Sequence, residues 1–179
     1  MAKPLRKTMV VACLALVALL SVGGATALAH GGGGKGRGGP KGGAGISASL
    51  VTAAAKELGV TAAALRTAIA GSAKAEIDEA LADGELESDE AAEAKERVDA
   101  SLKYAYSLSR ASTVAAGVGK TTAQLNAAFK TARRAAIVER IDEAVEDGEL
   151  EADEAAELKE ELKDAVLPGY KPARFGFGR

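Results

Sequence analysis

A short acidic sequence occurs twice in this chain and constrains its fold more than any other feature. The first copy, residues 77–98, reads IDEALADGELESDEAAEAKERV, and the second, residues 141–162, reads IDEAVEDGELEADEAAELKEEL. Each copy predicts a helix that ends at an Asp-Gly pair, because glycine readily takes the left-handed conformation found after helix C-termini. A corner with an inward-facing leucine and a second helix follow, so the chain is predicted to contain two related helical hairpins.

Composition supports a helical fold. The 179 residues are 47% hydrophobic but only 3% aromatic, and alanine is the largest part of the hydrophobic fraction. Alanine has the highest helix propensity, but it buries little apolar area. The prediction is therefore an all-α fold with closely packed helices: an antiparallel helical bundle of two tandem hairpin repeats, with disordered glycine-rich tails at both ends.

Residues 1–29 have the features of a secretory signal peptide. Three basic residues precede an unbroken apolar run from Met9 to Leu20, and Ala27-Leu28-Ala29 forms a small-residue cleavage site. We therefore expect a secreted, extracytoplasmic protein cleaved near Ala29, with an uncleaved membrane anchor as the alternative. Cleavage would remove the only cysteine, Cys13, so disulfides and thiolate metal sites are not expected.

Two segments are too rich in glycine and charge to form a core. Residues 30–45, HGGGGKGRGGPKGGAG, are predicted to be a disordered tether, and residues 168–179, PGYKPARFGFGR, a disordered basic aromatic tail. The three positive charges and three aromatic rings of the tail favour weak contact with anionic polymers or lipid headgroups. By contrast, all 25 acidic residues lie within residues 46–165.

Residues 46–109 form the first predicted repeat. A short helix should end at Gly59, and Thr61 should cap a long helix whose apolar side chains recur every four residues as far as Leu81. The helix after the corner is predicted to run without a break to Leu108. Its N-cap is expected at Ser88 or Asp89. Two i,i+4 ion pairs, Glu93–Arg97 and Asp99–Lys103, should stabilise it. Only one of its tyrosines, Tyr104 or Tyr106, should pack between the repeats.

Residues 110–167 form the second predicted repeat. Its long helix carries an apolar stripe that includes Ala136 and Val145, and its last helix should be capped by Asp153 and lined as far as Val166. The second hairpin is expected to be the better packed of the two, because larger side chains, Leu158 and Leu162, replace Ala94 and Val98 of the first.

The sequence GVGKTT at residues 117–122 resembles the end of a phosphate-binding loop. The leading glycine of that motif would fall at Val114, and no β-branched strand precedes it. We therefore expect a glycine helix stop followed by a threonine N-cap, and no nucleotide.

The two acidic corners are the candidate metal sites. With Gly84 at the sixth position of a calcium-binding loop, carboxylates fall at the fifth, ninth and twelfth positions, but Leu81 occupies the third in place of an oxygen ligand. The second copy has Val145 at that position. The six calcium candidates are Asp83, Glu87, Glu90, Asp147, Glu151 and Glu154.

The repeat unit resembles the tandem helical-hairpin repeats of secreted bacterial proteins of unknown function. Its D-G-x-L corner and the helix that follows are also similar to a SHOCT-type hairpin, in which the residue after the corner leucine is commonly a capping threonine. This chain has Glu87 and Glu151 at those positions, which is why the cap is expected to shift. The resemblance implies no catalytic residues and no ligand.

Taken together, these features predict an exported, non-enzymatic protein with a structural or interaction role at the cell envelope. No enzyme activity is expected, because the cleaved chain lacks cysteine and its one histidine, His30, lies in the tether. Nucleic-acid binding is disfavoured by the acidic folded part. An unknown protein or envelope polymer is the expected partner, and low-affinity calcium-dependent binding through the acidic corners is the alternative function.

Overall fold

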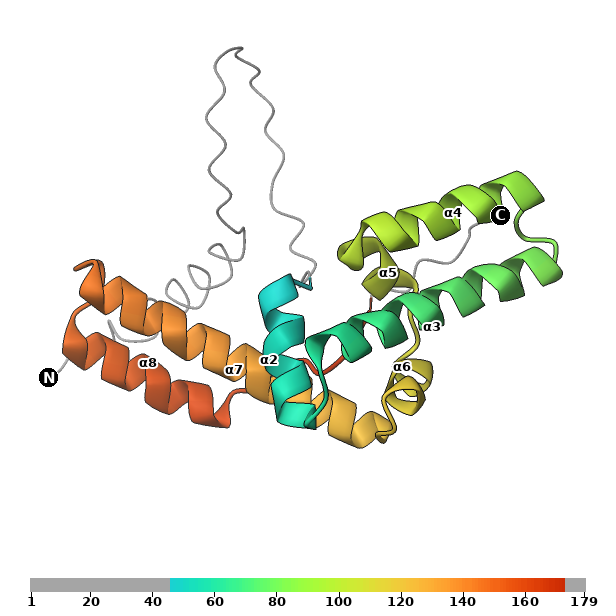
Figure 1. The fold of residues 1–179 in the computed structure, drawn as a ribbon. Helices are drawn as coiled ribbons and strands as arrows, with labels where there is room; N and C mark the ends of the chain where they lie inside the picture. Colours follow the sequence, from blue (N-terminus) through green and yellow to red (C-terminus); the bar gives the residue numbers. More distant parts are fainter. Residues whose placement is uncertain (1–45, 173–179) are drawn as a thin grey trace, which may run out of the picture. The chain divides into compact units, whose positions relative to one another are not determined.

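The structure is a computed structural model that describes residues 46–172. The predicted signal peptide, the tether and residues 173–179 lie outside the described residues. Within residues 46–172 the chain forms helices, turns and loops and no strand, which confirms the predicted all-α class (Figure 1). The helices are α2 (Ala48–Leu58), α3 (Ala62–Ala82), α4 (Ser88–Ala100), α5 (Leu102–Leu108), α6 (Ala111–Gly117), α7 (Thr122–Glu146) and α8 (Ala152–Asp164).

The predicted helix boundaries between the short and long helices are confirmed. Gly59 ends α2 at φ +67°, and the Thr61 side chain accepts a hydrogen bond from the Ala64 N–H at the start of α3. The GVGKTT sequence has the same structure: Gly119 lies at φ +64°, and Thr121 caps α7. This sequence is therefore a turn between helices, as expected.

The first hairpin, α3 and α4, contains much of the core. On α3, Leu65, Ile69 and Ile77 are fully buried, at the four-residue spacing expected from the sequence. The facing residues of α4 are small, and Ala91 and Val98 are both buried.

No single described helix is long and apolar enough to span a membrane, whereas α2 and α3, bent by 109°, meet that criterion only as a pair.

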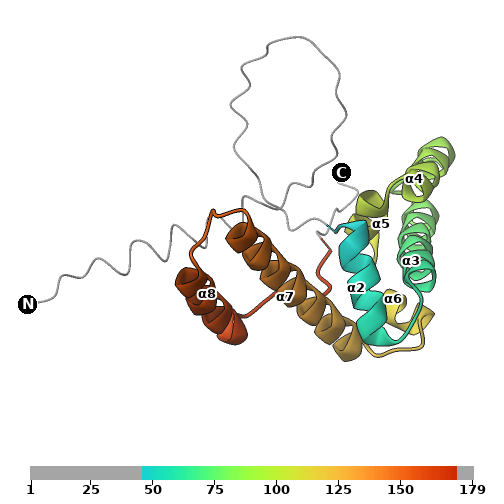
Figure 2. The ribbon, with the colours of Figure 1, turned by 60° about the vertical axis from the view of Figure 1, so that its left-hand side comes forward.

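Each short helix packs against the long helix of the hairpin that does not follow it in the chain. Helix α2 lies against α7, and α6 lies against α3, in addition to the contacts that each makes with its own long helix. Figures 1 and 2 both show α2 between the two hairpins. The contact between α6 and α3 is close, because a Cβ placed on Gly117 would lie only 3.1 Å from the Cβ of Ala68. Small residues therefore allow the two halves of the fold, α2–α5 and α6–α8, to pack closely against each other.

The helix after the first corner is broken at Ser101, which corrects the prediction of one continuous helix to Leu108. Ser101 is extended, at φ −138° and ψ 106°, and its hydroxyl accepts a hydrogen bond from the Tyr104 N–H. The break allows α5 to pack against both α3 and α4. As expected, the tyrosines differ: Tyr106 is buried, whereas Tyr104 is half-buried beneath the Arg97 guanidinium, 4.6 Å from its ring centre.

Most ion pairs of the described residues join different elements, contrary to the predicted pairs along one helix; the exception is Lys163–Glu160 within α8. Asp99 contacts Lys74 of α3 at 2.7 Å in place of Lys103, and Arg97 stacks on Tyr104 in place of pairing with Glu93. Each hairpin also has one equivalent clamp across its two helices. These clamps are Asp78–Lys95 in the first hairpin and Asp142–Lys159 in the second.

The second hairpin, α7 and α8, is less well packed than the first, so the opposite expectation is wrong. Leu158 is only half-buried, Ala136 is exposed, and Val166 is 94% exposed beyond the end of α8. In the first hairpin α5 covers α3 and α4, whereas the residues after α8 include Pro168 and Gly169 and form no helix. Leu162 is buried, but proline and glycine both disfavour a helix here, so the second hairpin lacks a third helix that would cover Leu158.

Part of the predicted C-terminal tail belongs to the fold. The C-terminal strap, residues 165–172, runs from α8 back to the junction of α5 and α7 (Figure 1). Tyr170 is only 4% exposed and lies in the hydrophobic core. The tail prediction was therefore wrong for Pro168–Pro172, because burial of the Tyr170 ring and the hydrogen bonds of Tyr170 and Lys171 together oppose the chain entropy lost on ordering.

At the end of α8, the Arg134 side chain supplies the hydrogen-bond donors that the next residues of a longer helix would supply. Its guanidinium donates hydrogen bonds to the carbonyl oxygens of Leu162, Lys163 and Ala165, at 3.1–3.2 Å. Of these carbonyls, only that of Leu162 also accepts a backbone hydrogen bond, from the Ala165 N–H at 3.3 Å. The partial negative charge of carbonyls at a helix C-terminus favours a cation. Arg134 therefore holds α8 against α7 where the first hairpin uses α5.

We predict that Arg134→Ala lowers the free energy of unfolding by about 1–2 kcal/mol, because charge-assisted hydrogen bonds are lost at partly buried carbonyls. Urea unfolding followed by helical circular dichroism measures this change. The control is Lys130→Ala, one turn earlier on α7 and exposed, which should change stability by less than about 0.5 kcal/mol. Equal effects of the two substitutions would refute the capping role.

Two glycines of the first hairpin should respond to alanine with opposite signs. Gly71 lies inside α3 with open space around it, so Gly71→Ala should stabilise the protein by about 0.5–1 kcal/mol. Gly84 lies at φ +73°, where a Cβ is strained, so Gly84→Ala should destabilise it by about 1 kcal/mol. Thermal melts of both variants test the pair, and a shift in the same direction would contradict the prediction.

Candidate functional site at the hairpin ends

The two corners have the same backbone structure. In the first, the Gly84 N–H donates to the Leu81 carbonyl at 3.1 Å, and the Glu85 N–H donates to the Ala80 carbonyl at 2.8 Å. In the second, the equivalent bonds run from Gly148 and Glu149. This pattern is a Schellman motif, in which a left-handed glycine lets the last carbonyls of a helix find donors. The predicted helix stops at Gly84 and Gly148 are confirmed.

The helices after the corners are capped by the two glutamates that were not expected to act as caps. Glu87 and Glu151 are the N-cap residues, so the predicted caps at Ser88 or Asp89 and at Asp153 are wrong. The Glu90 carboxylate accepts a hydrogen bond from the Glu87 N–H at 2.9 Å, and Glu154 accepts one from Glu151 at 3.3 Å. A glutamate at the third helical position can thus accept a hydrogen bond from the backbone N–H of the N-cap residue.

Each end presents five carboxylates to solvent. All ten are exposed, and within residues 46–172 none of them takes part in an ion pair. The nearest paired carboxylates are Glu79 and Asp142, which lie one helical turn or more before the corners. The ten are Asp83, Glu85, Glu87, Asp89 and Glu90 at the first end, and Asp147, Glu149, Glu151, Asp153 and Glu154 at the second.

The calcium candidates lie at these ends, but not on a calcium-binding loop. Helix α3 continues to Ala82, so Leu81 is helical and half-buried, and the loop proper contains only Asp83–Glu87. Glu90 and Glu154 already bond to their own N-caps. Among the residues that the structure describes, no group of three acidic, histidine or cysteine side chains is arranged to hold a metal ion.

One carboxylate away from the ends differs from the rest. Glu76 is largely buried, and its carboxylate lies 2.6 Å from Nε of Arg110, whose guanidinium also contacts Glu79 at 2.9 Å. Burial raises the pKa of Glu76, while the positive charge of Arg110 opposes the rise. The backbone of Arg110 is held as well, because its N–H donates to the Ser72 hydroxyl at 2.9 Å. This cluster joins α3 to the start of α6, so its role is in the fold.

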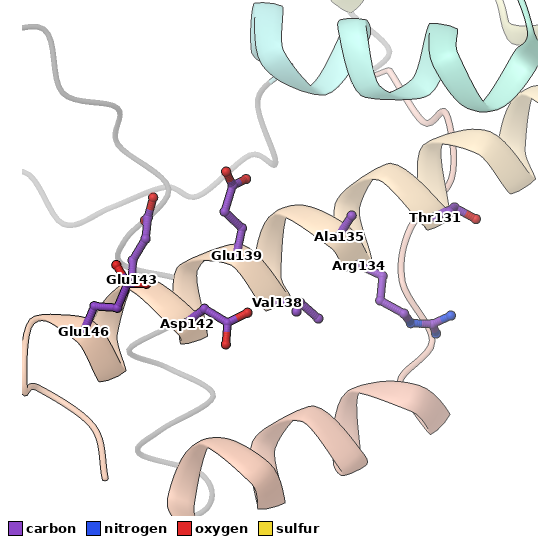
Figure 3. A pocket seen from close by; sticks show the side chains of 8 residues that line it. All are labelled: Thr131, Arg134, Ala135, Val138, Glu139, Asp142, Glu143 and Glu146. Atoms are coloured by element: carbon purple, nitrogen blue, oxygen red, sulfur yellow. The ribbon is translucent and has the colours of Figure 1, made fainter. Parts of the chain in front are cut away.

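A shallow, open groove follows one face of α7 (Figure 3). Arg134 and Asp142 point towards α8, where they already hold the helix end and Lys159, whereas Glu139 points away. Val138 lies between them. The polar groups of this groove therefore do not converge on one point at which a small ligand would sit.

The burial of Tyr170 was not predicted from the sequence. The ring of Tyr170 packs edge-on against Tyr106 and Phe129, with centroid distances of 4.8 and 5.0 Å. Tyr106 and Tyr170 are separated by 64 residues, the spacing of the two acidic copies. Extending that spacing beyond the acidic sequences would have placed Tyr170 at a position equivalent to a core tyrosine. Its burial also removes Tyr170 from the set of aromatic side chains predicted to contact polymers or lipids.

Comparison of the chain with protein-family models, with curated proteins and with solved structures finds no match. The resemblance to helical-hairpin repeats stays a prediction from the sequence.

Proposed function

We propose that this protein is an exported, non-enzymatic interaction protein that binds a basic partner at the cell envelope through its two acidic hairpin ends. The observation that supports this function is the exposure of the ten end carboxylates without ion pairs among residues 46–172. Exposed like charges that folding does not neutralise give a surface a strong potential, which attracts partners of the opposite charge.

The rest of the described chain acts as a frame for these ends. Residues 46–172 contain 25 acidic and 15 basic side chains, and several of the basic ones are used within the fold. Lys95 and Lys159 clamp the hairpins, Arg110 joins α3 to α6, and Arg134 holds α8. Two equivalent ends on one chain also allow bivalent attachment, which strengthens binding to a partner with repeated basic sites.

We predict that neutralising the exposed end carboxylates weakens binding to a basic polymer by about tenfold or more. The variant carries Asp83→Asn, Glu85→Gln and Asp89→Asn with the equivalent Asp147→Asn, Glu149→Gln and Asp153→Asn. Titration calorimetry with poly-lysine measures the affinity at low and high salt, since screening should weaken a charge-driven contact.

A matched control distinguishes the contribution of the carboxylates at the ends from that of the net charge of the protein. It neutralises six exposed carboxylates that lie away from the corners and outside the ion pairs: Glu57, Glu93, Glu96, Glu139, Glu157 and Glu161. We expect it to retain affinity within about threefold. Equal losses in both variants would show that net charge alone attracts the polymer, and would contradict a site at the ends. Cross-linking in the envelope then identifies the natural partner.

Weak calcium binding at the same ends is the alternative proposal, supported by the cluster of exposed oxygens at each corner. A site with a Kd of about 1 mM would add about 1 kcal/mol of stability at about 5 mM calcium, and so raise the Tm by several degrees. Because Glu90 and Glu154 already cap their helices, we predict a shift of less than about one degree relative to magnesium. A larger shift that Glu87→Gln with Glu151→Gln abolishes would favour calcium.

A further inference from the structure

The C-terminal strap is bound to the fold mainly through one residue. Tyr170 is 4% exposed, and its ring is wedged between Tyr106 of α5 and Phe129 of α7. Val166, Pro168 and Lys171 on the same strap are exposed. Tyr170 is therefore the single fully buried residue of the strap, and Leu167 is half-buried.

The hydrogen bonds of the strap resemble those of a bound peptide. The Tyr170 N–H donates to Oδ1 of Asn126 at 2.9 Å, and the Lys171 N–H donates to the hydroxyl of Tyr106 at 3.0 Å. The Tyr170 hydroxyl bonds to Ser109, whose own hydroxyl donates to the Tyr106 carbonyl at 2.9 Å. Side chains of the folded body thus satisfy two strap amides and one side chain, as in grooves that recognise extended peptides.

The position of Gly169 restricts which residues can precede the tyrosine in this groove. A Cβ at this position would lie 2.6 Å from Oδ1 of Asn126 and 2.9 Å from its Cβ. The backbone therefore has to approach Asn126 without a side chain, one residue before the anchor. The groove selects a Gly-Tyr pair, which the chain itself supplies.

The connection from α8 to the anchor is weakly held. Within residues 46–172, no hydrogen bond involves Val166, Leu167, Pro168 or Gly169, and the helix behind them is fixed separately by Arg134. Release of Tyr170 would therefore free the strap without unwinding α8. An end segment that leaves a self-complementary groove in this way meets the requirements for exchange between identical chains.

We propose that the groove formed by Tyr106, Ser109, Asn126 and Phe129 is an exchangeable peptide-binding site, in which the strap of a second copy of this chain replaces the chain's own. Exchange preserves every contact of the strap, because the occupant has the same sequence. Its equilibrium is governed by chain concentration against the high effective concentration of the tethered strap. The inference does not depend on the acidic ends.

The test uses full-length chains whose own strap is displaced. Tyr170→Ala removes the anchor, and Gly169→Ala creates the clash with Asn126 while leaving all groove side chains in place. The probe is a fluorescein-labelled peptide of residues 167–179, LPGYKPARFGFGR. We expect saturable binding to both variants, at least tenfold tighter than to the wild-type chain, in which the tethered strap competes. The same peptide with alanine in place of its tyrosine should not bind.

Oligomeric state gives the second readout. Wild-type protein refolded at high concentration should contain dimer detectable by size-exclusion chromatography with light scattering, whereas Tyr170→Ala should stay monomeric. No peptide binding to either variant while helical circular dichroism is retained would overturn the proposal, as would equal binding of the alanine peptide. Loss of helical structure in both variants would also overturn it, because a strap on which the whole fold depends cannot be exchanged.

Discussion

The close approach of small residues is the constraint on which this structure depends. Alanine and glycine bury little area each, so helices built from them are stable only when their backbones come close enough for many weak contacts. The fold achieves this by crossing its two halves, with α2 against α7 and α6 against α3. Gly117 beside Ala68 marks one such contact. Because each half completes the core of the other, neither hairpin has to supply a deep core alone.

Larger side chains appear where the crossed halves need closing. Leu65, Ile69 and Phe129 fill the interior, and Tyr106 and Tyr170 meet at the junction of the two halves. The hairpins extend from this centre, and polar contacts, such as the two Asp–Lys clamps and the guanidinium of Arg134, add to their apolar packing. Stability is thus concentrated at the junction, and charge is concentrated at the ends.

Local sequence rules predicted the local structure well. Glycine stops, the threonine caps and the apolar stripe of α3 follow from backbone conformation and helical periodicity, which act within a few residues. The errors in helix continuity and in burial arose where distant segments compete. Ser101 breaks a helix because α5 packs better on α3, Val166 is exposed because no third helix covers α8, and Tyr170 is buried because α5 and α7 form a groove for it. At the candidate site, the positions of the corner carboxylates were predicted, but the caps were assigned to Ser88 or Asp89 and to Asp153 in place of Glu87 and Glu151.

The tyrosine junction also decides what can be observed of this protein in solution. The chain has no tryptophan and three tyrosines, and two of these lie with ring centres 4.8 Å apart between the halves. Near-ultraviolet circular dichroism and intrinsic fluorescence therefore report on the junction, whereas the far-ultraviolet signal reports on all seven described helices. A difference between the two spectra during unfolding would reveal separation of the halves while the hairpins persist.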